Sequence, residues 1–501
     1  MRLRLTIAVL AALLGLPTGA AAVTTAQLNA VGAGPCPNVE SSFRCFSLTV
    51  PLDHFDPTNP ATTTIVIAIH RATAHRSKGL LVTAVGGPGA SGLTDADALL
   101  TTWSPAVIAA YDVVYFDQRG IGESGGLYCP RAVLASRRAE GAAVFDVVGS
   151  SRTFARRCSA ELDSTALLPF LGTRQAAEDL EAARLALGAP PLRLYGTSYG
   201  TELAAAYARQ HPEGLTGLIL DGVVDTSLSA PAFWASAARG FESVLNETLA
   251  SCSRRAACRQ DLPHGARRAY DQLNARLARH PVRVTGGTGL LTQALLHTYV
   301  GSALYTPSGR LGLLEDLAAA AHGDLSRLVE GAWIAEGVDP TTWRLLNTSV
   351  SYASYFGIQC ADSPAYVGTS NQRVAEWTTA ASVIDRQLPR IGEIVFLNNL
   401  PCAWWPSPPA LTSPPAPLVA AGIPTIVLTA TGDPITPHEQ GDAVVRSLAD
   451  GYLIRTLGGP HVTLSPDAPC PDRIVERFLL RDQLPARRTT CPGRFVAPYW
   501  R

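Results

Sequence analysis

Residues 192–204, with the sequence LRLYGTSYGTELA, join an apolar run to a helix-forming run through a turn of small residues. The turn matches the pattern G-x-S-x-G, with Gly196, Ser198 and Gly200 at its fixed positions. Between a strand and a helix, this pattern marks a turn so tight that only small residues fit on either side of the serine, whose hydroxyl is held above the sheet. The helix that follows directs its N-terminal amides toward the same point, where they stabilise negative charge. The stretch therefore predicts a strand, a sharp turn and a helix, with Ser198 as a nucleophile.

On both sides of this stretch the chain alternates β-rich runs with helical runs. Strands are predicted over residues 63–70, 79–85, 111–116, 192–195 and 218–220, and helices over residues 175–187 and through Ala208. Near-continuous apolar strands that alternate with helices are typical of a mostly parallel sheet covered on both faces. The fold class expected is therefore α/β.

The alternation stops near residue 226, where helical segments rich in Trp, Arg and Ala begin. A Pro-rich segment over residues 406–417 ends this region, and β-rich runs resume at residues 423–429 and 452–457. We therefore expect a core in two parts, interrupted by a helical lid. The boundaries predicted are 1–22 for a signal peptide, 23–225 for the first part of the core, 226–418 for the lid and 419–501 for the last part.

The N-terminus has the three parts of a secretory signal peptide. Two arginines precede an apolar run over residues 5–16, and Ala20, Ala21 and Ala22 form a small-residue cleavage site. The apolar run is shorter than the ~20 residues that a membrane-spanning helix needs, and no later run reaches that length. We therefore expect export and secretion, without stable insertion in a membrane.

The ten cysteines all follow the predicted signal peptide. In an exported chain an even number favours disulfides, although sequence alone does not prove their connectivity. Clustering along the chain suggests five local pairs: 36 with 45, 129 with 158, 252 with 258, 360 with 402 and 470 with 491. A zinc site would need tight sets such as C-x-x-C, which are absent from the sequence. We expect neither a metal nor an organic cofactor.

The charge balance excludes one class of partner. The chain has 501 residues, with 41 basic and 41 acidic side chains, and lacks long basic runs. This composition gives no electrostatic reason to expect binding to nucleic acid.

Two residues after the predicted strands of the C-terminal part complete the chemistry of Ser198. A serine hydroxyl is a weak nucleophile at neutral pH, so it needs a base and a carboxylate that orients the base. With this serine turn the order along the chain is Ser, acid, His, and Asp433 and His461 each follow a predicted strand. We assign Asp433 as the orienting acid and His461 as the general base. Asp221 and Asp225, after an earlier strand, are the alternative acids.

The tetrahedral intermediate of acyl transfer needs two backbone amides that face its oxyanion. The residue after the nucleophile, Tyr199, is one expected donor. The glycine-rich loop over residues 85–89 supplies the other, with Gly87 preferred and Gly86 second, unless this loop is an ordinary Gly-Pro turn.

Several motifs together resemble one family. They are VPLDHFDP at residues 50–57, GGPG at 86–89, DQRGIGES at 117–124, GTSYGT at 196–201, IQCAD at 358–362, TGDPITP at 431–437 and GPH at 459–461. These motifs look like the secreted tripeptidyl aminopeptidase branch of the proline iminopeptidase-like α/β-hydrolases. The resemblance implies an α/β-hydrolase fold and an exported serine exopeptidase that releases short peptides from free N-termini. Two departures are Val85, where iminopeptidases usually have His, and Tyr199 in place of their Trp, which favours the tripeptidyl branch.

The resemblance also implies a lid carboxylate that pairs with the substrate's ammonium group. The candidates are Asp362, next to Cys360, and Glu242, although a solvated or helix-capping role is open for each. Glu202, two residues after Gly200, is expected to pack behind the site.

Three other functions stay open. A carboxylesterase or lipase would use the same three residues, and an endopeptidase would differ in a lid open at both ends. A scaffold that only binds partners is disfavoured because each catalytic position holds a competent residue. The partner expected is the N-terminus of a peptide or protein, and the sequence leaves the oligomeric state open.

Overall fold

The computed structural model describes residues 23–498, apart from residues 38, 40–41, 75–76, 285–288, 347–349, 364–367, 408–409, 412 and 466–467. The predicted signal peptide, residues 1–22, lies outside the described residues.

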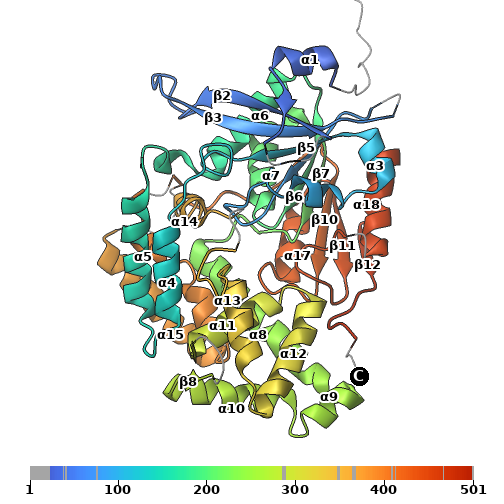
Figure 1. The fold of residues 1–501 in the computed structure, drawn as a ribbon. Coiled ribbons are helices and arrows are strands. Elements are labelled where there is room, and N and C mark those ends of the chain that lie inside the picture. The colour runs from blue at the N-terminus through green and yellow to red at the C-terminus, as the bar shows by residue number, and fades with distance from the viewer. Residues whose placement is uncertain are drawn as a thin grey trace, which may run out of the picture.

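A ten-stranded sheet forms the centre of the molecule (Figure 1). Its strands are β1 Gly34–Pro35, β2 Phe43–Pro51, β3 Thr62–His70, β4 Leu80–Ala84, β5 Asp112–Asp117, β6 Leu192–Thr197, β7 Leu215–Asp221, β10 Thr425–Ala430, β11 Gly451–Thr456 and β12 Arg488–Cys491. They lie in the order β1-β2-β3-β5-β4-β6-β7-β10-β11-β12. The pairs from β1 to β5 are antiparallel, and every pair from β5 to β12 is parallel. The mostly parallel sheet that the sequence predicts is confirmed.

The central strands are buried because helices cover both faces of the sheet. In β3, Ile65 and Ile67 pack against α6 (Thr173–Ala186) and α7 (Gly200–Gln210), together with α17 (His438–Ser447). The alternate residue Val66 packs on the other face with α3 (Pro105–Ala110) and α18 (Pro469–Arg481). Side chains of a strand alternate between its faces, so apolar residues at every position are what a two-sided burial requires.

Helices between β7 and β10 form a separate layer beyond the carboxyl ends of the parallel strands (Figure 1). They are α8 Ala230–Ser251, α9 Ala256–Asp261, α10 Ala266–Arg279, α11 Gln293–Ala303, α12 Pro307–Ala321, α13 Ser326–Ala335, α14 Tyr352–Ala361, α15 Ser370–Gln387 and α16 Gly392–Leu397. Short elements in or beside this layer are η3 Cys252–Arg254, η4 Leu400–Ala403, β8 Val282–Arg283 and β9 Leu290–Leu291. The remaining elements are α1 Thr25–Ala30, α2 Ala96–Leu100, η1 Leu168–Phe170 and η2 Pro212–Gly214.

Two further helices, α4 (Pro130–Glu140) and α5 (Val147–Glu161), join this layer although they lie between β5 and β6 in the chain. Phe154 of α5 packs on Phe356 of α14, with ring centroids 5.2 Å apart. The helical layer is thus built from two segments of the chain, whereas the sequence analysis assigns the first of them to the core. The segment is short and largely polar, so only its packing against distant helices reveals its place.

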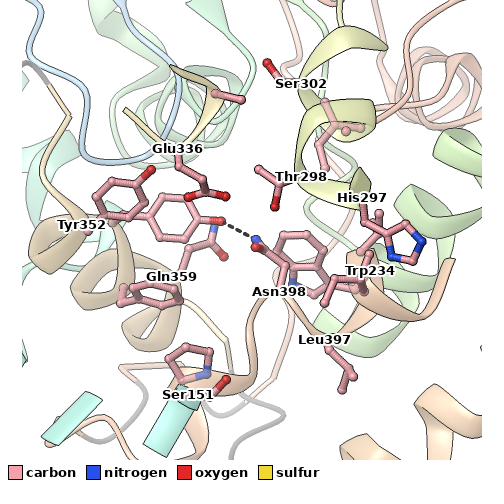
Figure 2. Close-up of a pocket in the computed structure, with 18 of the residues that line it drawn as sticks. Ser151, Trp234, His297, Thr298, Ser302, Glu336, Tyr352, Gln359, Leu397 and Asn398 are labelled. Carbon is pink, nitrogen blue, oxygen red and sulfur yellow. Dashed lines mark hydrogen bonds between the residues drawn. The ribbon is translucent and has the colours of Figure 1, made fainter. Parts of the chain in front are cut away.

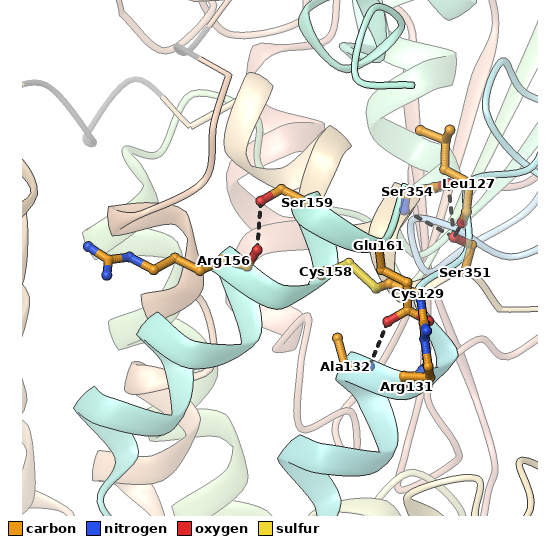
Figure 3. The surroundings of a disulfide bond; sticks show 10 residues. All are labelled: Leu127, Cys129, Arg131, Ala132, Arg156, Cys158, Ser159, Glu161, Ser351 and Ser354. Carbon is orange, nitrogen blue, oxygen red and sulfur yellow. Dashed lines mark hydrogen bonds and ion pairs between the residues drawn. A yellow bond between two sulfur atoms is a disulfide. The ribbon is translucent and has the colours of Figure 1, made fainter. Parts of the chain in front are cut away.

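The five predicted disulfides are all present. The bond between Cys129 and Cys158 ties the start of α4 to the end of α5 (Figure 3). Beside it, the Glu161 carboxylate accepts hydrogen bonds from the amides of Arg131 and Ala132, both at 2.9 Å. These amides have no partner within their own helix, so Glu161 caps α4. The disulfide and the cap together hold α4 and α5 as one hairpin.

Candidate active site

Ser198 stands at the carboxyl end of β6, directly before α7. Its φ of 52° lies in the left-handed region, which is strained for a residue with a side chain. A side chain at Gly200 would place its Cβ 1.9 Å from the carbonyl oxygen of Ala84, and one at Gly196 would come within 2.5 Å of the Gly200 oxygen. Both glycines are therefore needed for the strand and the helix to approach each other around Ser198.

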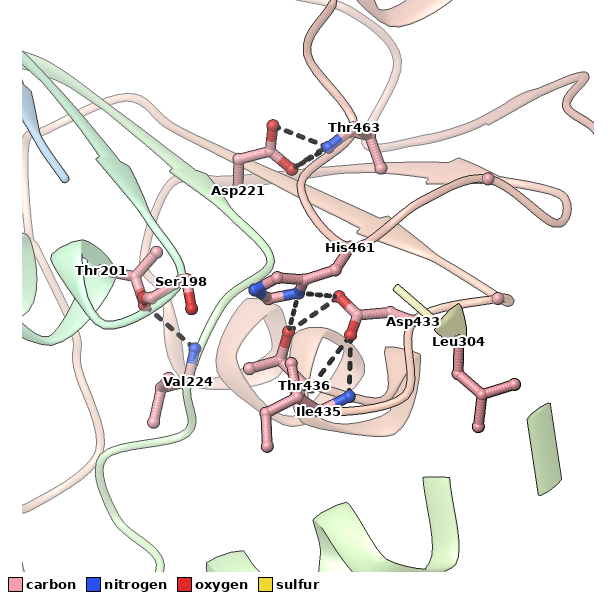
Figure 4. A network of polar contacts seen from close by, with 12 residues as sticks. Ser198, Thr201, Asp221, Val224, Leu304, Asp433, Ile435, Thr436, His461 and Thr463 are labelled. Carbon is pink, nitrogen blue, oxygen red and sulfur yellow. Dashed lines mark hydrogen bonds and ion pairs between the residues drawn. The ribbon is translucent and has the colours of Figure 1, made fainter. Parts of the chain in front are cut away.

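Asp433 and His461 follow β10 and β11 and meet opposite Ser198 (Figure 4). The Nδ1 atom of His461 is 2.8 Å from Oδ2 of Asp433. The other carboxylate oxygen of Asp433 accepts hydrogen bonds from the amides of Ile435 at 3.1 Å and Thr436 at 3.0 Å. The Thr436 hydroxyl donates to Oδ2 at 2.8 Å. The carboxylate is thus fixed on all sides, and it fixes one edge of the imidazole.

The electrostatics favour a proton on His461. Burial of the imidazole lowers its pKa, but the charge and hydrogen bond of Asp433, with the charge of Asp221, raise the pKa above its ordinary value of 6.5. Tyr305 supports the same ring: its carbonyl accepts from the His461 amide at 2.8 Å, and its ring meets the imidazole edge-on at 5.3 Å between centroids. The Ser198 hydroxyl faces this imidazole without a direct hydrogen bond (Figure 4). In unliganded sites such bonds are often long and tighten with substrate.

Of the three candidate acids, only Asp433 contacts the His461 side chain. Asp221 accepts hydrogen bonds from the amides of Thr463, at 2.8 Å, and Leu464, at 2.8 Å. Asp225 is bound to the amide and hydroxyl of Ser227, at 3.0 and 2.6 Å. Asp221 therefore anchors the loop that follows His461, and Asp225 closes a local turn.

The candidate oxyanion donors lie around Ser198. A Cβ at Gly86 would be 2.9 Å from the Cβ of Ser198, so the loop passes directly against the nucleophile. Gly87, with a φ of 111°, lines the cavity in front of Ser198. The Tyr199 hydroxyl is held by Thr173 at 2.7 Å and by Gln118 at 3.1 Å, which fixes the first residue after the nucleophile. This leaves both Gly86 and Gly87 as candidates for the second amide.

A cavity of about 480 Å³ is lined by Ser198 and by residues of the helical layer. Figure 2 shows part of its lining, with Trp234, Glu336 and Tyr352 around the open space. Its walls come from the core, from α4 and α5, and from the helices between β7 and β10. The aromatic side chains in these walls are Phe145, Phe154, Phe233, Trp234, Phe241, Tyr305, Tyr352, Tyr355 and Phe356, with Tyr199 from the core. The cavity is therefore mainly apolar, as is usual for a site that binds an organic substrate.

The two carboxylates predicted to bind an ammonium group do not reach this cavity. Asp362 accepts from the amide of Thr173 at 3.1 Å and from its hydroxyl at 2.6 Å, and so caps α6. Glu242 accepts from the amides of Arg390 at 3.1 Å and Ile391 at 3.2 Å. Neither is among the described residues that line the cavity. Both predictions are corrected: each carboxylate satisfies backbone amides that would otherwise be buried without a partner.

Three other acidic residues line the cavity: Glu140, Glu202 and Glu336. Glu140 ends α4, and Glu336 follows α13, so distant segments bring them together. Arg137 lies between them, 3.1 Å from Oε1 of Glu140 and 2.5 Å from Oε2 of Glu336. Burial and the nearby charge of Glu336 raise the pKa of Glu140. Sequence reasoning missed this pair because no motif surrounds either residue.

Glu202 lines the cavity, whereas the sequence analysis placed it behind the site. It lies in the first turn of α7, whereas Ser198 precedes this helix and has a left-handed φ. Closeness in sequence to the serine turn places Glu202 near Ser198 but does not indicate which way its side chain points.

One group of described residues has spacing suited to a metal ion, namely Glu181, His211 and Glu213. It lies at the far end of α7 from Ser198, and Glu181 is paired there with Arg184 at 2.6 Å. This group is separate from the cavity.

Comparison with known proteins agrees with this geometry. The profile of the family described as "alpha/beta hydrolase fold" matches residues 86–275, and that of "TAP-like protein" matches residues 388–491. The chain is 30% identical to serine protease Hip1 of Mycobacterium tuberculosis over 470 residues, which cover 89% of this chain and 87% of that protein.

Two further relatives carry different names. Carboxylesterase B of Mycobacterium tuberculosis is 29% identical over 476 residues, covering 89% of this chain and 86% of that protein. Tripeptidyl aminopeptidase of Streptomyces lividans is 27% identical over 484 residues, covering 91% and 84%. The strand order, the serine turn and these matches over most of the chain lead to one conclusion: the chain is an α/β-hydrolase that belongs to the TAP-like family of serine protease Hip1.

Proposed function

We propose that this protein is an exported serine exopeptidase that hydrolyses peptide bonds near free N-termini through Ser198, His461 and Asp433. The observation that carries the proposal is the His461–Asp433 pair opposite a strained serine, in a cavity that three glutamates line. The names of the relatives, serine protease and tripeptidyl aminopeptidase, support the same class of reaction.

In the proposed reaction Ser198 Oγ attacks the carbonyl carbon of the substrate while Nε2 of His461 takes the hydroxyl proton. The amides of Tyr199 and Gly87 stabilise the negative oxygen that forms. His461 then gives its proton to the leaving amine, and the C–N bond breaks to leave an ester on Ser198. Water, deprotonated by His461, hydrolyses this ester and restores the serine. Asp433 holds the ring in the correct tautomer.

Glu140 and Glu336 are proposed to bind the substrate's ammonium group. Two carboxylates face one guanidinium, that of Arg137, so the cluster carries a net negative charge when all three groups are ionised. Arg137 also lies over the ring of Tyr352, 4.8 Å from its centroid, which limits its freedom to move. A cation from the substrate would complete the charge balance and lower the pKa of Glu140.

The helices between β7 and β10, with α4 and α5, are proposed to close the cavity on the side of the substrate's N-terminus. Such closure limits the number of residues that fit before the scissile bond, which distinguishes an exopeptidase from an endopeptidase.

Export is proposed from two features. Residues 1–22 have the pattern of a signal peptide, and the five disulfides are typical of chains that fold in an oxidising compartment. In the part of the chain that the structure describes, no helix is both long enough and apolar enough to span a membrane.

The test is hydrolysis of a matched pair of tripeptide p-nitroanilides, one with a free N-terminus and one acetylated, beside p-nitrophenyl acetate. We expect release of nitroaniline from the free peptide only. Equal cleavage of both peptides would identify an endopeptidase. Cleavage of the ester alone would favour the second candidate, a carboxylesterase, which the name of one relative supports.

A further inference from the structure

Glu202 is the acidic residue nearest to Ser198 in the sequence among those that line the cavity. Glu202 lies in the first turn of α7, where the core meets the helical layer. Its side chain is partly exposed. The carboxylate forms no hydrogen bond or ion pair with any residue in the described part of the chain. Glu202 thus differs from Glu140 and Glu336, which already share Arg137.

Among the residues that the structure describes, no cation forms an ion pair with Glu202. Arg209, seven residues further along α7, is within electrostatic reach but donates instead to the Thr226 hydroxyl at 2.8 Å and the Ala416 carbonyl at 2.9 Å. Asp362, directly after α14, adds a second negative charge. The remaining titratable neighbours, Tyr199 and Tyr355, are neutral at physiological pH because burial raises the pKa of each further.

These neighbours determine the pKa of the Glu202 carboxyl group. Burial and the charge of Asp362 raise the pKa of Glu202 to about 8, against the weaker opposite effect of Arg209. An ionised carboxylate that is partly shielded from water and has no partner is costly, so a positive group delivered by a substrate would ionise Glu202 and pair with it.

We propose that Glu202 binds a positively charged group on the substrate residue whose carbonyl is transferred to Ser198. The shared chemistry is an ammonium or guanidinium group, carried by a Lys or Arg side chain or by the α-amine of that residue. The inference rests on the proposed function, because it concerns the same acyl transfer at Ser198. It adds a determinant of specificity separate from the Glu140–Glu336 pair.

The experiment compares Ala-Ala-Lys-p-nitroanilide with Ala-Ala-norleucine-p-nitroanilide, whose side chain has the same four carbons but no amine. The protein is tested as the wild type, as Glu202→Gln, as Glu202→Asp and as Glu376→Gln, an exposed acid on α15 that serves as control. We expect the wild type to prefer Lys, and Glu202→Gln to lower the ratio of kcat/KM for Lys over norleucine by about tenfold, as loss of one charge-assisted hydrogen bond predicts. Glu202→Asp retains part of the preference, and Glu376→Gln keeps the wild-type ratio.

The dependence on pH gives a second readout. Because Glu202 must be ionised to pair with a cation, the wild-type preference for Lys should increase as the pH rises toward and past 8, while the Lys side chain stays protonated. Glu202→Gln should remove this increase.

The source of the cation is distinguished by p-nitrophenyl acetate, which has no charge. If Glu202→Gln lowers hydrolysis of norleucine-p-nitroanilide, whose free α-amine belongs to the reacting residue, relative to this ester, the α-amine is the bound group. An unchanged Lys to norleucine ratio with an unchanged ratio of norleucine-p-nitroanilide to ester hydrolysis would overturn the inference. The proposed function fails separately, if the wild type hydrolyses neither peptide.

Discussion

The carboxyl edge of the sheet and the helical layer above it supply different parts of the cavity. At the sheet edge, Ser198, Asp433 and His461 each follow a strand within a few residues, and backbone amides hold their loops. In the helical layer, Glu140 and Glu336 come from separate segments and meet only through packing. The edge is fixed by local geometry and the layer by tertiary contacts. We therefore expect substitutions at the edge to act on turnover and those in the layer to act on substrate choice.

The largest effect is expected at the nucleophile. Ser198→Ala should lower kcat by about 10⁶-fold, because no other group at this position can form the acyl-enzyme. The strained φ is easier for Ala than for a larger residue, so the thermal unfolding midpoint should change little. Rates with a free tripeptide p-nitroanilide and a melting curve test this pair of outcomes. A variant that retains turnover would exclude Ser198 as the nucleophile.

Asp433→Asn tests whether turnover depends on the contact between Asp433 and His461 at the sheet edge. The variant should lower kcat by about 10⁴-fold, because an amide no longer holds the imidazole in the required tautomer. Asp225→Asn is the matched control and should keep the wild-type rate, because the Asp225 carboxylate hydrogen-bonds to Ser227 of its own turn and not to His461. If Asp433→Asn turned over normally, the orienting acid would have to be sought elsewhere.

A substitution in the helical layer should have a different signature. Glu140→Gln removes one carboxylate from the cluster around Arg137. It should raise KM for peptides with a free N-terminus by roughly tenfold or more, because a hydrogen bond to a charged group contributes that much to binding. The kcat value should fall much less. Initial-rate kinetics of Glu140→Gln beside Glu376→Gln measure this split. A fall in kcat at constant KM would contradict the separation between edge and layer.

The smallest effect concerns the acid side of the pH profile. His461 acts as a base when neutral, so kcat/KM is lost as the pH falls through its raised pKa. Asp221→Asn removes a negative charge that favours the protonated imidazole, so the pKa of His461 falls and the acid limb moves to lower pH. The profile is measured with the norleucine substrate. An unmoved limb would show that Asp221 acts only by anchoring Thr463 and Leu464.

The same contrast explains which features are predictable from the sequence. Strands β6, β10 and β11 each carry an apolar run, and the positions of Ser198, Asp433 and His461 at the ends of these strands follow from those runs and from short glycine-containing turns. The cysteine pairs are also predictable, because each bond joins two consecutive cysteines of the chain.

Which acidic side chains line the cavity was not predictable in this way. Asp362 stands in a recognisable motif beside Cys360, yet its side chain turns toward Thr173 to cap a helix. Glu140 lies in the ordinary sequence RRAEG and gains its role from Arg137 and the remote Glu336. Side chains whose position depends on contacts far along the chain leave no local pattern.

The hairpin of α4 and α5 bears on how specificity could be exchanged between relatives. It is closed by its own disulfide and its own cap, and it supplies Glu140 and Phe154 to the cavity from a segment that precedes the nucleophile in the chain. A chimaera that receives only residues 226–418 from a donor protein would therefore have a cavity lined partly by donor residues and partly by the host's own α4 and α5. A graft meant to carry the donor's substrate preference must also include residues 129–161.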